Sequence, residues 1–134
     1  MARMTFVNLA VRDLARSKAF FASLGFGFDP RFTDGQAACL VLSELACVML
    51  LEERFFRAFT RRELCDTSRR TEALVAFSCE SRSDVDALAE RALAAGGREA
   101  LGPEDLGFLY GRSFYDPDGH HWECFWLDAA RARG

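Results

Sequence analysis

The stretch MTFVNLAVRDLARSKAFFASLG at residues 4–25 decides the fold, because its pattern returns as LVAFSCESRSDVDALAERALAAG at residues 74–96. Each stretch opens with β-forming residues, passes through a polar residue that can cap a helix, and continues as a helix that stops at glycine. Strand-like runs follow each stretch. An internal repeat constrains a fold more than any single residue can. The sequence therefore predicts two β-α-β-β-β modules, at about residues 4–52 and 72–128.

Turn residues divide the rest of the first module into strands. The Asp34-Gly35 pair lies between apolar runs, which is a strong signal of a β-hairpin, and a short turn is expected at residues 43–44. A second helix is expected from residue 53 to about 65, and the polar residues 66–71 are interpreted as the linker between the modules. The strands expected in this part are residues 26–32, 36–42 and 45–51.

The second module contains an Asp-Pro-Asp-Gly turn at residues 116–119, where Pro presets the first corner and Gly tolerates the last. Its helix is expected to begin at a capping serine, either Ser81 or Ser83, and to end before two glycines. The later strands expected in this module are residues 98–101, 108–115 and 120–127.

The composition is that of a folded protein. A chain of 134 residues is one domain of ordinary size, so we expect a single domain over residues 1–134 whose modules pack on each other or on a second copy. Half of the residues are hydrophobic and 13 are Phe, which is enough for a packed core. The net charge is only −3, and acidic residues are interspersed among the arginines of residues 54–70. This pattern argues against a nucleic-acid partner.

The cysteines and the N-terminus bear on the cellular setting. The five cysteines are odd in number and no two form a C-x-x-C pair, so neither a disulfide framework nor a zinc knuckle is indicated. Nothing at the N-terminus resembles a signal peptide, and no apolar run approaches the length of a membrane span. We therefore expect a cytoplasmic protein without a membrane partner.

The repeated modules, the Tyr110-Gly111-Arg112 strand and the ending DPDGHHWE at residues 116–123 resemble the glyoxalase, bleomycin resistance protein and extradiol dioxygenase superfamily. Its members are also called vicinal oxygen chelate proteins. The resemblance covers about the whole chain. It implies an α+β fold in which the two modules form a curled, cup-like mixed sheet with the helices outside. It also implies that a homodimer completes the cup and that a small-molecule ligand lies inside.

The resemblance also implies where a metal would be held. In metal-dependent members one ligand comes from each module's first strand, usually His, and one from each last strand, usually Glu. Here the first-strand positions are Phe6 and Leu74, and only Glu123 matches. The last strand of the first module offers Cys47, Val48 or Met49. Because hydrocarbons cannot donate to a metal, we expect no cofactor. A divalent metal displaced to His121, Glu123 and Cys47 is the alternative.

Strand alternation places mostly apolar side chains on the face where the resemblance puts ligands. Apolar walls with few polar groups are typical of a small-molecule pocket. Glu123 is the predicted catalytic residue, because desolvation among apolar side chains suits a carboxylate to act as a general base. The alternative is an ion pair between Glu123 and Arg112 or another nearby arginine. The residues predicted to bind the ligand are Phe6, Asn8, Leu74, Ala76, Arg112, His121 and Phe125.

The sequence leaves three possible functions open. The leading hypothesis is a protein that binds a small, partly apolar organic molecule in a cup that has lost most of the family's metal ligands, as in the bleomycin resistance branch. The second is an enzyme: a lyase, dioxygenase or isomerase that uses Glu123 with a displaced metal or with none. The third is a structural or regulatory partner protein with an empty cup.

Overall fold

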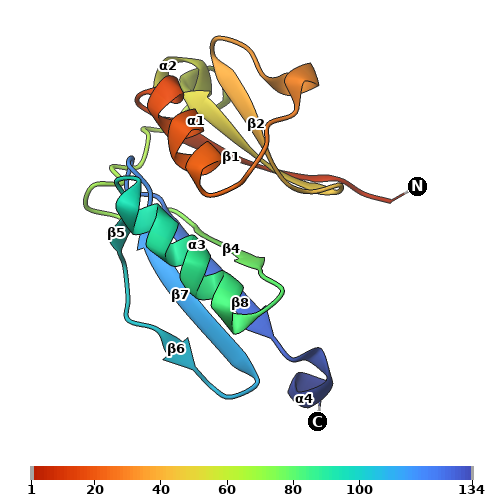
Figure 1. Cartoon of the computed structure of the whole chain (residues 1–134). Helices are drawn as coiled ribbons and strands as arrows, with labels where there is room; N and C mark the ends of the chain where they lie inside the picture. Colours follow the sequence, from red (N-terminus) through yellow and green to blue (C-terminus); the bar gives the residue numbers. More distant parts are fainter. Residues whose placement is uncertain (1, 134) are drawn as a thin grey trace. The chain divides into compact units, whose positions relative to one another are not determined.

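The computed structural model describes residues 2–133, so residues 1 and 134 of the expected domain lie outside the described part. The chain divides into two compact units, Met1–Asp66 and Thr67–Gly134, and each unit contains one open mixed sheet and one main helix (Figure 1). The predicted α+β class is confirmed. No helix within residues 2–133 has the length and apolar character needed to cross a membrane.

The first unit holds the first module. Its three-stranded sheet has the order β1-β3-β2, in which β1 runs parallel to β3 and β2 runs antiparallel to β3. Asp13 caps α1 as its side chain accepts a hydrogen bond from the backbone nitrogen of Arg16 at 3.1 Å. The elements are β1 (Thr5–Val11), α1 (Leu14–Ser23), η1 (Pro30–Phe32), β2 (Ala37–Ser43), β3 (Ala46–Glu52), α2 (Glu53–Phe56) and η2 (Arg57–Phe59).

The core of this unit lies between α1 and one face of the sheet. Alternate residues of β1, Leu9 and Val11, are buried, while Phe6 and Asn8 on the other face are exposed. This alternation follows from the two-residue period of a strand. Phe20 and Phe21 supply the buried side of α1, and their rings meet edge to face at 5.0 Å.

The prediction of a strand at residues 26–32 is wrong. Only Phe28 forms an isolated bridge, with Leu40, and residues Pro30–Phe32 form the 3-10 helix η1. Pro30 has no backbone N–H to give to a strand partner, and its fixed φ suits the first turn of a helix. The run of apolar residues therefore does not continue as a strand.

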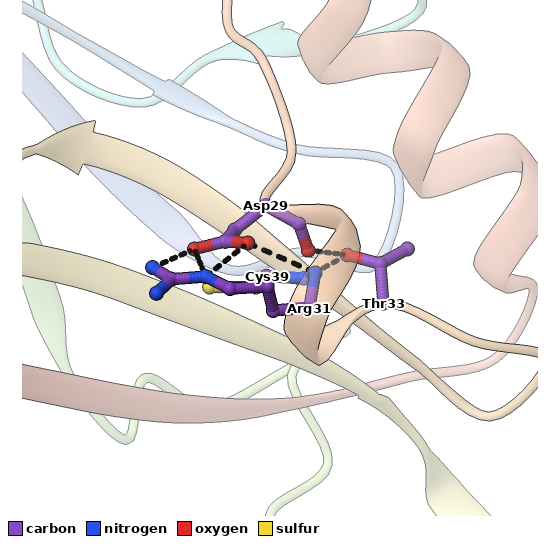
Figure 2. Close-up of polar contacts among 4 residues, drawn as sticks. All are labelled: Asp29, Arg31, Thr33 and Cys39. Atoms are coloured by element: carbon purple, nitrogen blue, oxygen red, sulfur yellow. Dashed lines mark hydrogen bonds and ion pairs between the residues drawn. The ribbon is translucent and has the colours of Figure 1, made fainter.

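Hydrogen bonds around Asp29 hold η1 in place (Figure 2). The Asp29 carboxylate accepts from the backbone nitrogen of Arg31 and pairs with both Nε and Nη2 of its guanidinium, at 2.7 Å for Nη2. The Arg31 hydrogen bonds keep the pKa of Asp29 below its usual value. The Thr33 hydroxyl donates to the Asp29 carbonyl and accepts from the backbone nitrogen of Cys39, which ties η1 to β2.

The helix expected from residue 53 to about 65 is too long. Helical structure ends with η2 at Phe59, and Thr60 is extended, with φ −141° and ψ 154°. The Thr60 side chain accepts a hydrogen bond from the backbone nitrogen of Arg62 at 3.2 Å, so it organises the loop that follows. Such local bonds from threonine compete with helix continuation.

The second unit repeats the arrangement of the first. Its sheet has the order β4-β8-β7-β5, β6 pairs with β7, and β4 runs parallel to β8 as β1 does to β3. Of the two predicted caps, Ser81 accepts a hydrogen bond from the backbone nitrogen of Asp84 at the start of α3. The elements are β4 (Leu74–Ser78), α3 (Arg82–Ala94), β5 (Arg98–Glu99), β6 (Glu104–Asp105), β7 (Leu109–Tyr115), β8 (His121–Leu127) and α4 (Ala129–Arg133).

The Asp-Pro-Asp-Gly turn is built around the buried carboxylate of Asp116. One carboxylate oxygen accepts from the backbone nitrogens of Asp118 and His120, and the other accepts from the Trp122 indole at 2.9 Å. Burial raises the pKa of Asp116 above its usual value, although His120 and the hydrogen bond from Trp122 act in the opposite direction. Gly119 completes the turn with φ +88°, a conformation that favours glycine.

Candidate functional site

Each sheet has one face against its helix, and we name the opposite face, turned away from α1 or α3, the far face. In the first unit the far face of β1 and β3 carries Phe6, Asn8, Cys47 and Met49, with Phe6 opposite Cys47 and Asn8 opposite Met49. In the second unit Leu74 lies opposite His121 and Ala76 lies opposite Glu123. The predicted alternation is confirmed by the burial of β1, β4 and residues 121–125 of β8, whereas residues on both faces of β3 are buried.

A cavity of about 470 Å³ opens on the far face of the first unit. Its walls come from two sources: the strands β1 and β3, and the segment α2–η2 with the residue that follows it. The rings of Phe55 and Phe59 meet edge to face at 5.1 Å, which fixes one wall. The polar groups of the lining are the Asn8 amide and the Thr60 hydroxyl. The lining residues are Asn8, Met49, Leu51, Phe55, Phe56, Phe59 and Thr60.

Glu123 lies in a smaller hollow, of about 40 Å³, on the far face of the second unit. Ser113 lies opposite it on β7, and His121 lines the same hollow. A Cβ at Gly111 would come within 3.2 Å of the Glu123 carboxylate, so glycine leaves the space that the carboxylate occupies. Within the described part of this unit, residues 67–133, no hydrogen bond or ion pair engages the Glu123 carboxylate.

Arg112 also lines this hollow, but its side chain does not lie on the far face. It lies opposite Cys124 on the α3 side of the sheet, where its guanidinium is 2.9 Å from a Glu90 carboxylate oxygen and 3.4 Å from Asp86. Its side chain is 15% exposed. The alternative of an ion pair between Arg112 and Glu123 is therefore wrong. Arg112 is also the exception among the predicted site residues. The other seven, Phe6, Asn8, Leu74, Ala76, His121, Glu123 and Phe125, lie on the far face of their own sheet.

The two histidines of the final motif have separate surroundings. The His120 side chain is buried, with Nδ1 3.4 Å from the Glu72 carboxylate, and it belongs to the turn. The His121 ring lies on the far face and meets the Tyr115 ring edge to face at 5.4 Å. His121 is therefore the histidine that can contact a ligand beside Glu123.

Comparison with known proteins agrees with this geometry. A family model described as the Glyoxalase/Bleomycin resistance protein/Dioxygenase superfamily matches residues 3–124. The chain belongs to this superfamily.

Several solved structures share the fold of this chain. A hypothetical protein, SA1046, from S. aureus is 26% identical, with a TM-score of 0.79 and 95% of each chain covered. A glyoxalase/bleomycin resistance protein/dioxygenase family enzyme from Burkholderia phytofirmans is 19% identical, with a TM-score of 0.76, covering 94% of this chain and 99% of that one. The fosfomycin resistance protein FosX from Mesorhizobium loti is 18% identical, with a TM-score of 0.67, covering 100% and 97%. No curated protein sequence matches the chain significantly.

The sequence left open whether Cys47, Val48 or Met49 corresponds to Glu123 in the first module. The strand register, which is the same in both units, identifies the residue. Glu123 lies opposite Ala76, two residues after Leu74, and the equivalent partner two residues after Phe6 is Met49. Of the residues at these positions, Phe6 and Leu74 carry no donor atom, Met49 carries a soft thioether and Glu123 carries a carboxylate. Within residues 2–133, no three His, Cys, Asp or Glu side chains lie close enough together to hold a metal.

Several lining residues were not predicted from the sequence. Leu51 and Thr60 line the large cavity, and Gly111 and Ser113 line the hollow around Glu123. For Gly111 and Ser113 a signal existed: strand alternation excludes Arg112 from the face that its two neighbours occupy. Thr60 gave no such signal, because the sequence pattern suggested that it lay inside a longer helix.

Proposed function

We propose that this superfamily member binds a small, partly apolar organic molecule in the cavity on the far face of the first unit. The observation that carries the proposal is the cavity itself, whose volume of about 470 Å³ lies within the range of small-molecule sites. Its walls are mainly Phe, Leu and Met, and its polar groups are few. This combination favours a ligand with an apolar body and one or two hydrogen-bonding groups.

The polar contacts define the orientation that such a ligand would take. Asn8 can both donate and accept through its side-chain amide. Within residues 2–133 no protein group forms a hydrogen bond with that side-chain amide. The Thr60 hydroxyl already accepts from Arg62 and keeps its own proton to donate. A ligand carbonyl or hydroxyl near these two groups would place its apolar part against Phe55, Phe56 and Phe59.

An uncharged fluorescent probe, N-phenyl-1-naphthylamine, tests the proposal. Phe59 lines the cavity and is 68% exposed, while Phe32 is 46% exposed on the same unit and lies outside the lining. Because both rings are exposed, both Phe59→Ala and Phe32→Ala should fold. We expect saturable probe binding that Phe59→Ala weakens by about tenfold, since about 1.5 kcal/mol of apolar contact is lost, and that Phe32→Ala leaves within twofold. Absence of saturable binding, or equal weakening by both variants, would contradict the proposal.

A second candidate function is catalysis by Glu123. It is favoured by a carboxylate that has no partner in its own unit and lies in a hollow beside His121. Such a carboxylate can take a proton from a ligand that reaches it. Compounds that displace the probe would be followed by NMR for turnover with the wild type, Glu123→Gln and the exposed control Glu99→Gln. Turnover lost only in Glu123→Gln supports catalysis, and turnover unchanged in that variant rejects the role.

We also propose a homodimer in the cytoplasm. The support for the dimer is the exposure of apolar side chains on the far face of each unit, where Leu74 is 65% exposed and Phe6 is 41% exposed. Exposed apolar side chains of this size mark surfaces that other groups cover. Sedimentation equilibrium should give twice the mass of the chain, and a single-chain mass at all concentrations would refute the dimer. A chain that binds no probe and no compound would favour the structural or regulatory alternative.

A further inference from the structure

A second, polar cavity lies on the other unit, outside the proposed apolar site. It has a volume of about 140 Å³ and is lined by residues 67–71 together with Arg98 and Tyr115. Three arginines, Arg69, Arg70 and Arg98, are among the lining residues, and no Asp or Glu is. Positively charged side chains that gather around one small cavity attract an anion to it.

The segment at residues 67–71 is held at both ends, although the sequence suggested a linker. At one end the Thr67 hydroxyl donates to the carbonyl of Asp118, and the Thr67 carbonyl packs so closely on Gly119 that a Cβ there would be 2.2 Å from it. At the other end Glu72 lies 3.4 Å from Nδ1 of the buried His120. The arginines between these anchors are therefore presented from a fixed backbone.

The opposite wall of the cavity is also ordered. Arg98 on β5 pairs across the sheet with Tyr115 on β7, and its guanidinium carbon is 6.0 Å from the centre of the Tyr115 ring. The same ring meets His121 edge to face. Stacking on an aromatic ring leaves the edge of a guanidinium, which carries its N–H donors, free to bind an oxyanion.

We propose that this cavity is a binding site for a phosphate-type oxyanion, free or carried by a small phosphorylated molecule. Guanidinium groups match the geometry of phosphate oxygens and form paired, charge-assisted hydrogen bonds with them. The hydroxyls of Ser68 and Thr71 line the same cavity and supply further polar groups. The absence of carboxylates from the lining selects against cations. The site lies in the second unit and is independent of the proposed apolar site in the first.

Titration with inorganic phosphate, followed by calorimetry at constant ionic strength, tests this site. Arg98→Gln and Arg69→Gln each remove one guanidinium from the lining, and both side chains are exposed, so folding should be kept. Arg54→Gln is the matched control, because it removes the same charge from an exposed position in the first unit. We expect one phosphate per chain, about tenfold weaker binding in each of the first two variants, and no change in the control.

Three results would overturn the proposal. One is the lack of saturable phosphate binding to the wild type. Another is equal weakening by Arg54→Gln, which would show attraction to net charge and not to a site. The third is a short DNA duplex that binds the wild type tightly and all three variants equally, which would show general attraction to polyanions. The neutral naphthylamine probe binds elsewhere, so failure of the phosphate site and failure of the apolar site can be told apart.

Discussion

The close approach of Gly119 to Thr67 predicts a large effect of a single methyl group. Gly119 has φ +88°, and a Cβ built on it would lie 2.2 Å from the carbonyl oxygen and 2.9 Å from the carbonyl carbon of Thr67. Ordinary contacts are longer by about 1 Å or more, so the backbone at Thr67 must retreat by that amount in Gly119→Ala. The retreat would break the hydrogen bond from the Thr67 hydroxyl to Asp118.

The magnitude follows from these two effects. A left-handed conformation costs alanine about 1–2 kcal/mol, and the broken hydrogen bond and displaced backbone add about 2 kcal/mol. Gly96→Ala is a matched control, because Gly96 has φ +111° and nothing lies within 4 Å of its Cβ position. We therefore expect Gly119→Ala to lower the free energy of unfolding by about 3–4 kcal/mol and Gly96→Ala by about 1–2 kcal/mol.

Urea unfolding followed by tryptophan fluorescence measures this difference. Both tryptophans of the chain, Trp122 and Trp126, lie in the second unit together with the two glycines, so the signal reports the unit that is changed. A gap of about 2 kcal/mol separates the midpoints by about 1–2 M urea. Equal midpoints for the two variants would refute the contact between Gly119 and Thr67. Gly119→Ala should also weaken phosphate binding, since residues 67–71 line that cavity.

Three further predictions concern side chains of both units. Hydrogen bonds from Arg82 lower the pKa of Asp105 to about 2. The ionised pair therefore stabilises the fold above about pH 4, and this contribution is lost as the pH falls towards 2. Between about pH 4 and pH 2 the urea midpoint of Arg82→Gln should change less than that of the wild type. Trp122→Phe removes the buried donor to Asp116 and should lower the free energy of unfolding by about 2–3 kcal/mol, measured in urea by circular dichroism; a loss below about 1 kcal/mol would contradict the reasoning. Cys79 is partly exposed, and its hydrogen bond with Cys124 lowers the pKa of Cys79. The same hydrogen bond and burial raise the pKa of Cys124, and burial raises the pKa of Cys39 to about 11. Mass spectrometry should therefore find iodoacetamide on Cys79 before it is found on Cys39 or Cys124.

The sequence predicted well what depends on local pattern. The duplication, both main helices, the cap at Asp13 and the alternation of the first and last strands all follow from residue spacing, and the structure confirms them. It failed where one residue changes the course of the chain. Pro30 ends an apolar run that otherwise suits a strand, and Thr60 stops a helix whose phenylalanines continue the helical pattern.

The candidate site was predictable in part for the same reason. Alternation placed seven of the eight predicted residues, all but Arg112, together on the far face of their strands. Arg112 was assigned to the ligand without its alternation being applied, and its partners Asp86 and Glu90 are on a helix that is 22 to 26 residues away in sequence. The polar cavity depends on contacts between residues 67–71 and the turn at residues 116–119, about 50 residues apart, which no local pattern reports.

The order of strands has a consequence for how the protein is made. In both sheets the strand that the ribosome delivers last, β3 or β8, lies between strands that were delivered earlier. During translation, β1 therefore has no strand to pair with until β3 has been synthesised, and β4 has none until β8 has been synthesised. A nascent chain that stops short of residue 121 would expose the edge of β4 together with Leu74, and such edges promote aggregation. The second sheet is complete only after β8, residues His121–Leu127, has been synthesised.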